Sequence, residues 1–264
     1  DVCVWHVSDL AQGGHLVRKL AGHEDIVRGI AIHPDGHTIA SVSDRTIRLW
    51  DLPSGQLRHR LQGSEQQQWA CVAFSPDGAY LATGSMAQDL WLWDVQTGVA
   101  LHALHGHTNW VRWLAFHPNG SVLVSTSNDS TVRLWQIEAI RKTSTFDVAA
   151  NEDICQLLPG ASHKAYRALY SPDGNLLAIA GHRWDIRLWA PNAVNGPTLQ
   201  RTLQAHSDPI LGLAFHPAGK MLASGSMDQT VRLWDIASGQ SHATLQGYSN
   251  WLVEVAFSPD GGTL

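Results

Sequence analysis

The sequence is poor in charge and in long apolar runs, and each shortage excludes a class of protein. Only 16% of its 264 residues are charged while 44% are hydrophobic, a balance that excludes a disordered chain. The formal net charge is −5 and the basic residues are scattered singly, so no basic patch for nucleic acid is expected. No apolar run approaches the roughly 18 residues of a membrane span, and the N-terminus lacks a signal pattern. We therefore expect a folded cytoplasmic protein with no nucleic-acid and no membrane partner.

Cysteines and catalytic motifs are scarce as well. Cys3, Cys71 and Cys155 are far apart and form no C-x-x-C pair, so neither a disulfide framework nor a thiolate metal site is expected. The chain contains no G-x-S-x-G, G-x-x-x-x-G-K-[ST] or H-E-x-x-H motif. These are the local signatures of serine hydrolases, P-loop nucleotide binding and zinc proteases. We expect no enzyme activity, no catalytic residue, no cofactor and no metal.

What the sequence does contain is a repeat of about 44 residues. Tryptophans that close a short apolar run recur at spacings of 45, 43, 42, 54 and 45, and a Pro-Asp-Gly-like turn keeps the same period. Pro presets φ at the first corner of such a turn and Gly accepts a positive φ at its last. An array of equivalent units explains the repetition, because every unit faces the same neighbours. We interpret the histidines at the start of three turns as solvated residues rather than metal ligands. The tryptophans are Trp5, Trp50, Trp93, Trp135, Trp189 and Trp234, and the turns begin at His33, Ser75, His117, Ser171, His216 and Ser258.

Each repeat holds four short β-rich runs bounded by Gly, Asp, Asn or Ser, such as "LGLAF", "MLASGS" and "TVRLWDI" between Leu211 and Ile236. Apolar runs of this length favour strands, and none has the length or spacing of an amphipathic helix. Four strands every 40 to 45 residues are typical of one propeller blade. With its "GH", "HPDG" and "RLWD" motifs, the sequence resembles WD-repeat (WD40-type) β-propellers along its whole length. It is also similar to the highly regular repeats of prokaryotic multidomain signalling proteins.

The resemblance implies an all-β fold of four-stranded antiparallel blades, each with strands a, b, c and d from the centre outward. Residues 1–264 then form a single propeller domain or a fragment of one. We expect residues 1–20 to be strands c and d of a split blade, residues 21–249 to be five complete blades, and residues 250–264 to be strands a and b of a split blade. Six blades' worth is present, and two arrangements stay open. The chain is a portion of a seven-bladed or larger array, or it is a nearly closed six-bladed ring.

The resemblance also implies a buried polar network in each blade. The Trp of strand c donates to a Ser of strand b, the Ser meets the His of the "GH" before strand a, and the His meets an Asp at the b-to-c turn. These groups suit one another because an indole only donates, a carboxylate only accepts, and a hydroxyl and an imidazole do both. A Ser-His-Asp hydrolase is the alternative, but a nucleophile must be exposed beside an oxyanion site, whereas these residues recur in blade after blade. The expected sets are His23, Ser41, Asp44 and Trp50; His107, Ser125, Asp129 and Trp135; and His206, Ser224, Asp228 and Trp234.

Two repeats depart from this network. In the repeat of Trp93, "GSEQQQ" replaces the "GH" and Ala87 stands at the Asp position. In the repeat of Trp189, the His and Asp positions hold Ala161 and Arg183. Without the network these blades must depend more on apolar packing, and we predict that they are the softer ones.

The longest interval, 54 residues, separates Trp135 from Trp189. The "L-x-G-H" end of strand d is echoed in "LLPGA", so strand d is expected near residues 153–158. The extra residues then lie in a c-to-d loop around residues 137–152. Loops longer than the usual few residues are often functional and equally often harmless insertions, and both interpretations stay open.

If the repeated residues build the scaffold, function belongs to the positions at which the repeats differ. In WD-repeat proteins ligands commonly contact the top face, through residues three and five places after the "GH" His and the residue just before the turn Asp. Here these positions are rich in aromatic, Met and Arg side chains, the types enriched in interface hot spots. The resemblance therefore implies a top-face site for a protein or peptide. Its residues are Trp110, Arg112, Trp251, Tyr166, Lys164, Arg28, Met86, Met227, His182 and Asn128.

We therefore expect a non-catalytic protein–protein interaction scaffold or sensor domain. The alternative is a regulatory propeller of a larger NTPase or kinase signalling protein that packs on its own chain. A channel-site enzyme, which needs a convergent carboxylate or His cluster, and a nucleic-acid binder, which needs a basic face, are weaker alternatives. In a further interpretation, Trp110 and Trp251 only fill the channel mouth and contact neighbouring blades.

Overall fold

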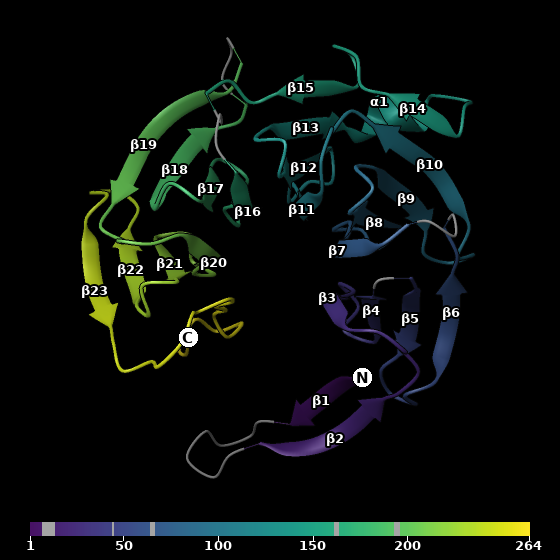
Figure 1. The fold of residues 1–264 in the computed structure, drawn as a ribbon, viewed down its shortest axis with the longest axis horizontal. Coiled ribbons are helices and arrows are strands. Elements are labelled where there is room, and N and C mark those ends of the chain that lie inside the picture. The colour runs from purple at the N-terminus through teal and green to yellow at the C-terminus, as the bar shows by residue number, and fades with distance from the viewer. Residues whose placement is uncertain (7–13, 44, 64–66, 161–163, 193–195) are drawn as a thin grey trace. The chain divides into compact units, whose positions relative to one another are not determined.

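The computed structural model describes residues 1–6, 14–43, 45–63, 67–160, 164–192 and 196–264. Asp44 and Ala161, two residues singled out above, lie outside the described residues. Over those ranges the chain forms 23 strands and one five-residue helix (Figure 1). The strands form six sheets, and all but one of the strand pairs are antiparallel. The all-β class and the four-stranded antiparallel sheets predicted from the sequence are confirmed.

The chain divides into two compact units. The first comprises Asp1–Gly106 and Ser144–Ala149, and the second comprises His107–Thr143 and Ala150–Leu264. In the first unit, one sheet pairs β1 (Val2–His6) with β2 (His15–Leu20). The next sheet has the order β3 (Val27–Ile32), β4 (Thr38–Ser43), β5 (Ile47–Asp51) and β6 (Leu57–Leu61). The third has the order β7 (Trp69–Phe74), β8 (Tyr80–Ser85), β9 (Leu90–Asp94), β10 (Ala100–His105) and β14 (Asp147–Ala149).

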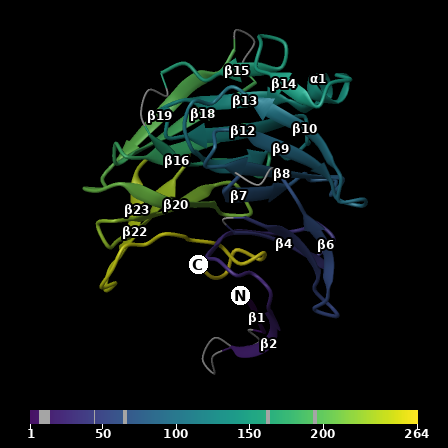
Figure 2. The same cartoon turned by 45° about the vertical axis from the view of Figure 1, so that its right-hand side comes forward.

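The second unit contains three sheets and the short helix. Each of its sheets has four strands in antiparallel order. In both views, the sheet that contains β20 lies beside the sheet that contains β16 (Figure 1, Figure 2). The elements are β11 (Val111–Phe116), β12 (Val122–Ser127), β13 (Val132–Gln136), α1 (Ile137–Arg141), β15 (Cys155–Leu157), β16 (Ala165–Tyr170), β17 (Leu177–Gly181), β18 (Asp185–Ala190), β19 (Thr198–Gln204), β20 (Ile210–Phe215), β21 (Met221–Ser226), β22 (Val231–Asp235) and β23 (Ser241–Leu245).

The core lies between neighbouring sheets of a unit. The second strand of each larger sheet is buried at nearly every position, as in β12 and β21, because both of its faces are covered. Side chains from two sheets interdigitate there, for example Val124 and Leu134 of one sheet with Leu177 and Trp189 of the next. The fourth strands are largely exposed, as the pattern of β23 shows.

The repeated turns also join neighbouring sheets, which the sequence interpretation missed. At the turn of His117, the N–H of Gly120 donates to the His117 carbonyl (2.8 Å) and Gly120 adopts φ 76°. The imidazole is 6% exposed, lies edge-on to Tyr170 and bonds the Gly174 carbonyl through Nε2 (3.1 Å). The expectation that these histidines are solvated is therefore wrong, because each reaches the turn of the next repeat. His33 does the same with Gly78 (3.0 Å).

The long segment between Trp135 and the repeat of Trp189 contributes three elements. Its end forms the predicted strand d, since β15 pairs with β13 through Leu134↔Gln156. Its middle strand, β14, runs parallel to β10 with Leu104↔Val148 in register and extends that sheet at its edge. Its start forms α1, which buries Ile137 and Ile140.

The predicted strands a and b in residues 250–264 are not formed. Residues 246–264 are described and contain no strand. The turn there has its usual geometry, since the Ser258 N–H donates to the Thr263 carbonyl (2.9 Å). The segment before the turn pairs with no strand among the described residues. The assignment of residues 1–20 as strands c and d stays a prediction, as does the number of blades.

Candidate functional site

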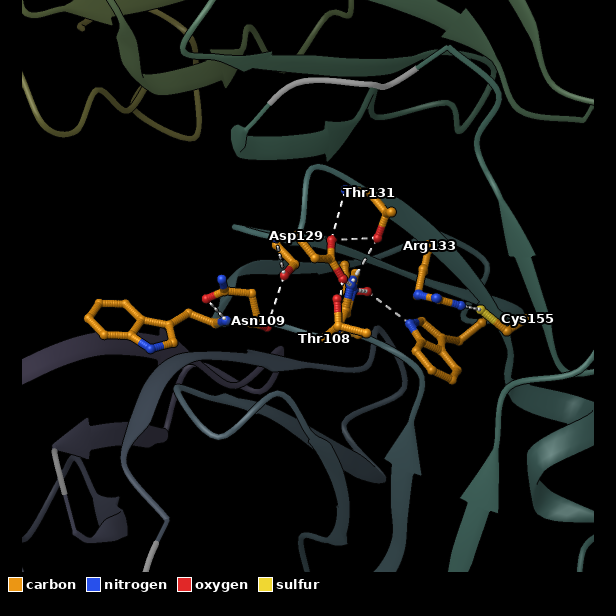
Figure 3. A network of polar contacts seen from close by, with 11 residues as sticks. Thr108, Asn109, Asp129, Thr131, Arg133 and Cys155 are labelled. Carbon is orange, nitrogen blue, oxygen red and sulfur yellow. Dashed lines mark hydrogen bonds and ion pairs between the residues drawn. The ribbon is translucent and has the colours of Figure 1, made fainter.

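The polar network expected in the repeat of Trp135 has complete geometry in the β11-β12-β13-β15 sheet (Figure 3). The Trp135 Nε1–H donates to Ser125 Oγ (2.9 Å), and Ser125 Oγ lies 2.7 Å from His107 Nε2. His107 Nδ1 lies 2.7 Å from Asp129 Oδ2. Because the Ser125 oxygen accepts from the indole, its own proton goes to Nε2, and the imidazole donates from Nδ1 to the carboxylate. Thr131 closes the network by donating to Asp129 Oδ1 (2.6 Å).

Burial and hydrogen bonding hold this network in one protonation state. Burial lowers the pKa of His107 despite the opposing influence of Asp129, so the imidazole stays neutral. Burial by itself would raise the pKa of Asp129, but hydrogen bonds from His107, Thr131 and the Thr108 N–H outweigh it and bring that pKa below its ordinary value. The carboxylate is ionised and the imidazole neutral, so every group of the chain has a suitable partner.

The same contacts recur in two further sheets. In the sheet of β20, Trp234 donates to Ser224 (2.8 Å), and His206 lies 2.7 Å from both Ser224 and Asp228. In the sheet of β3, an indole, a serine hydroxyl and an imidazole are again in contact, but the described residue that contacts Nδ1 of the imidazole is a threonine. The contacts are Trp50 to Ser41 (2.8 Å), His23 Nε2 to Ser41 (2.6 Å) and His23 Nδ1 to Thr46 (2.8 Å).

Sequence reasoning missed the threonines of these networks. Thr46, Thr131 and Thr230 each stand two places after an Asp at the b-to-c turn. Thr131 and Thr230 donate to that Asp at 2.6 and 2.7 Å. The recurrence of Thr at this position was the available signal.

The repeat of Trp93 carries a different network from the one expected. Its indole donates to Thr83 (2.9 Å), which stands in the place of the Ser. The same sheet is unusually aromatic, with Trp91 stacked on Trp93 at 5.3 Å and both rings within 6 Å of Trp69. Phe146, from the long loop, packs edge-on to Trp91 at 5.2 Å.

This sheet also has an ionic network of its own. Asp89 accepts from Gln67 (3.2 Å) and lies 2.8 Å from His105 Nδ1, while His105 Nε2 lies 3.0 Å from Asp147 of β14. The hydrogen bond to Asp147 raises the pKa of His105, against the effect of burial. This repeat therefore lacks the His and Asp positions of the repeated network, as its sequence indicates, but Asp89 and His105 form a second polar network from other positions.

The repeat of Trp189, by contrast, lacks the network in the part of the chain that is described. Ile179 takes the serine position, since it pairs with Arg187 as Ser125 pairs with Arg133. Arg183, at the Asp position, is exposed. The indole nitrogen of Trp189 is buried and has no hydrogen-bond partner among the described residues.

The residues predicted for recognition occupy equivalent places in their sheets. In four sheets, a backbone hydrogen bond joins two of the predicted positions of one repeat. The donor is the N–H of the residue just before the Asp position of the b-to-c turn. The acceptor is the carbonyl of the residue three places after the His position, at the start of strand a. The pairs are Met86 to Gln68 (2.7 Å), Asn128 to Trp110 (2.9 Å), His182 to Lys164 (3.0 Å) and Met227 to Pro209 (2.9 Å).

Four of the ten predicted recognition residues form one cluster, which we call the Arg112 surface: Trp110, Arg112, Asn128 and Tyr166. The Arg112 guanidinium lies 5.4 Å from the ring centre of Trp110 and 5.7 Å from that of Tyr166. Its Nε–H donates to Asn128 Oδ1 (2.8 Å). Because Tyr166 belongs to the next sheet, Arg112 spans two sheets with one cation between two rings.

The other six predicted residues lie outside this cluster. In the second unit, Trp251 is 59% exposed, Lys164 and His182 are exposed, and Met227 is half-buried. Arg28 is exposed and Met86 half-buried, and both belong to the first unit. Within the second unit, four of the predicted residues therefore form one cluster through Arg112.

A second arginine next to the Arg112 surface was missed in the sequence. The guanidinium of Arg167 lies 4.1 Å from the ring centre of Trp113, and its Nη2 pairs with Glu254 at 2.9 Å. Unlike Arg112, Arg167 has its charge matched by a carboxylate. Its position beside Tyr166 in β16 was the available signal.

Two classes of feature are absent from the described ranges. No three His, Cys, Asp or Glu side chains there gather into a group that could hold a metal ion. Likewise, none of the helices described is long and apolar enough to cross a membrane.

Comparisons with known proteins agree with the fold. The family model "WD domain, G-beta repeat" matches residues 14–51, 55–94, 98–136 and 197–235, which together are more than half of the chain. Nuclear distribution protein PAC1 of Arthroderma otae is 29% identical, over 83% of this chain and 60% of its own length. PAC1 of Ajellomyces capsulatus is 32% identical, with the same coverage of both chains. Periodic tryptophan protein 2 of Arabidopsis thaliana is 29% identical, over 74% of this chain and 20% of its own length.

The chain thus spans about 60% of the length of its PAC1 relatives. Four-stranded antiparallel sheets, the recurring Trp-Ser-His-Asp contacts and the family match all lead to one conclusion. The chain belongs to the WD-repeat family, and its sheets are blades of a WD-repeat β-propeller.

Proposed function

We propose that this chain is a non-catalytic interaction module that binds a protein or peptide at the Arg112 surface, with Trp251 as a further contact. The observation that carries the proposal is the exposure of two large aromatic rings at positions predicted for recognition, one of them held beside Arg112. Trp110 is 42% exposed and Trp251 is 59% exposed. Neither ring is buried against neighbouring blades, which favours recognition over a purely packing role.

The Arg112 surface suits binding because its side chains are already held in place. Two aromatic rings and the Asn128 amide restrain the Arg112 guanidinium, so little rotamer entropy is left to lose when a partner binds. Tyr166 and Trp110 supply apolar area beside hydrogen-bonding groups, a combination that is common in the centres of interfaces.

The burial of the Ser-His-Asp groups supports the absence of catalysis. Ser125 is 0% exposed and His107 is 4% exposed, so a substrate cannot reach the hydroxyl. The second candidate occupant is another domain of the same chain, because intramolecular partners use the same chemistry. The net charge of −5 disfavours nucleic acid.

The test is peptide selection against the intact chain, followed by calorimetry on Trp110→Ala/Trp251→Ala. Because aromatic hot spots are worth about 2 kcal/mol or more, we expect binding of the selected peptides to weaken at least about 30-fold. The melting temperature should stay within about 3 °C of the parent because both rings are exposed.

Trp5→Ala is the matched control, since Trp5 is 57% exposed and belongs to the other unit. Binding should be unchanged in this variant. Unchanged binding in the double variant, or a large loss of melting temperature, would show that the two tryptophans serve packing instead.

A further inference from the structure

The sheet that lacks the polar network contains a pocket in the corresponding place. The pocket is lined by residues that include Ile179 at the serine position, Arg183 at the Asp position and Trp189, and by Lys164 and Arg187. Its empty volume, with the open mouth included, is about 340 Å³.

Trp189 belongs to the lining of this pocket and carries a buried hydrogen-bond donor. Trp189 is 5% exposed, and its Nε1–H has no acceptor among the described residues. In two other sheets, the indole N–H of the equivalent tryptophan, Trp135 or Trp234, donates to the serine of strand b. By register, Ile179 takes the place of those serines in this sheet, and its side chain offers only carbon. An indole can only donate, so a group that satisfies it must be an acceptor.

The charges around the pocket are unequal. Asp185 is matched by Arg187 at 3.2 Å, and Arg187 also donates to the Gly160 carbonyl (2.7 Å). Lys164 and Arg183 are exposed, and neither has an ion pair with a described residue. Two cations are therefore available at the mouth, and no carboxylate in the described part of the chain pairs with them.

We propose that this pocket receives the carboxylate of a Glu or Asp side chain from an acidic partner peptide. One carboxylate oxygen accepts the Trp189 Nε1–H, and the other lies toward Lys164 and Arg183. The partner thereby supplies the acceptor that Ser125 and Ser224 supply within their own sheets. The inference rests on the proposed function, because Lys164 and His182 belong both to the pocket and to the predicted recognition residues.

The lining of the pocket suits a carboxylate, because it combines a buried N–H donor residue with two cations at the mouth. The apolar side chains of Ile179, Ala165 and Ala180 in the lining lower the local polarity and so strengthen a charge-assisted hydrogen bond to the indole. A neutral amide of the same shape would leave the cations at the mouth unmatched, so glutamine should bind far more weakly than glutamate.

The test is a titration of the intact chain, labelled with ¹⁵N-tryptophan, with two peptides that differ in one group. The peptides are acetyl-Ala-Ser-Glu-Ser-Ala-amide and its twin with Gln in place of Glu. The indole resonance of Trp189 is assigned by its loss in Trp189→Phe. We expect it to move downfield and to saturate with the Glu peptide, at least about tenfold more tightly than with the Gln twin.

Two further variants keep the proposal falsifiable if Trp189→Phe folds poorly. Lys164→Ala/Arg183→Ala removes two exposed side chains and should weaken binding of the Glu peptide at least about fivefold. Ile179→Ser provides an internal acceptor for the indole and should also weaken binding of the Glu peptide. Equal responses to the two peptides, no saturable response to either, or unchanged affinity in Lys164→Ala/Arg183→Ala would overturn the assignment.

The outcome separates this inference from the proposed function. Trp110→Ala/Trp251→Ala should leave the response of Trp189 to the short Glu peptide intact, while it weakens the longer selected peptides. If those longer peptides bind through the Arg112 surface and the Glu peptide does not bind, only the pocket assignment fails.

Discussion

Two neighbouring sheets of the second unit share a backbone register and differ in their interior. In the β11-β12-β13-β15 sheet, Trp135 donates to Ser125 and the chain continues to His107 and Asp129. In the β16-β17-β18-β19 sheet, Trp189 occupies the same place and has no acceptor among the described residues. A blade can therefore form without the polar network, and the space left over becomes a pocket.

The difference shows what the repeated residues contribute. The backbone ladders of the two sheets are alike, so the network is not needed to define the strands. It ties the start of strand a to strands b and c through groups that are all satisfied, which is the condition for a buried polar network to rigidify a fold. Where it is lost, the sheet depends on apolar contacts such as Leu177 and Trp189 against Leu134 and Val124.

The largest expected effect is the difference in stability loss when the residue at the Asp position of the b-to-c turn is replaced in one sheet or in the other. Asp129→Ala leaves the His107 Nδ1–H, the Thr131 hydroxyl and the Thr108 N–H without their acceptor. The free energy of unfolding should fall by about 2–4 kcal/mol. Arg183→Ala, at the same position of the other sheet, should change it by less than about 0.5 kcal/mol because that side chain is exposed. Urea denaturation of both variants measures the difference, and equal losses would remove the distinction between the sheets.

A smaller effect is expected from acidification. Burial lowers the pKa of His107 and His206 below the ordinary 6.5, and burial with the nearby Arg48 lowers that of His23 to about 4. The unfolded chain then binds protons first, so stability is full above 6.5 and is lost as the pH falls toward the folded-state pKa values. The slope for one histidine cannot exceed about 1.4 kcal/mol per pH unit.

His105 works in the opposite direction, because its raised pKa gives stability at low pH that is lost as the pH rises. Denaturation curves between pH 7 and pH 4 should show a shallower decline in His206→Gln than in the parent. An identical decline would mean that the network histidines are not the groups that titrate.

The smallest effect concerns the missing hydroxyl. Ile179→Ala and Ile179→Ser both remove buried apolar atoms, but only Ser offers Trp189 an acceptor. A buried serine is ordinarily no better than alanine, so a Ser variant more stable than the Ala variant by about 1 kcal/mol would report the new hydrogen bond. Thermal denaturation of the pair is the measurement, and a Ser variant that is less stable than the Ala variant would show that the indole does not face position 179.

Much of the fold could be predicted from the sequence because its determinants are local and repeated. Strand lengths, the Pro-Asp-Gly turns and the positions of the network serines follow from short motifs that keep one period. The strand at Cys155–Leu157 was also placed correctly, since "LLPGA" echoes the end of strand d. The register of the predicted recognition positions follows from the same period.

The remaining features depend on contacts that are distant in the sequence. Asp147 meets His105 from 42 positions away, and β14 adds to β10 in parallel, which no local motif indicates. The pocket beside Ile179 depends on how the side chains around Trp189 pack. The turn histidines were misjudged because the partner of His117, Gly174, belongs to the next repeat.

The most direct test of the account is amide hydrogen exchange in these two sheets, measured in one sample. The central claim is that the repeated polar network rigidifies a blade, while a blade without it is softer and open to a ligand. Amides of Leu177–Gly181 should exchange at least about tenfold faster than those of Val122–Ser127, a difference of about 1.4 kcal/mol in opening free energy. Equal or slower exchange in Leu177–Gly181 would contradict the claim.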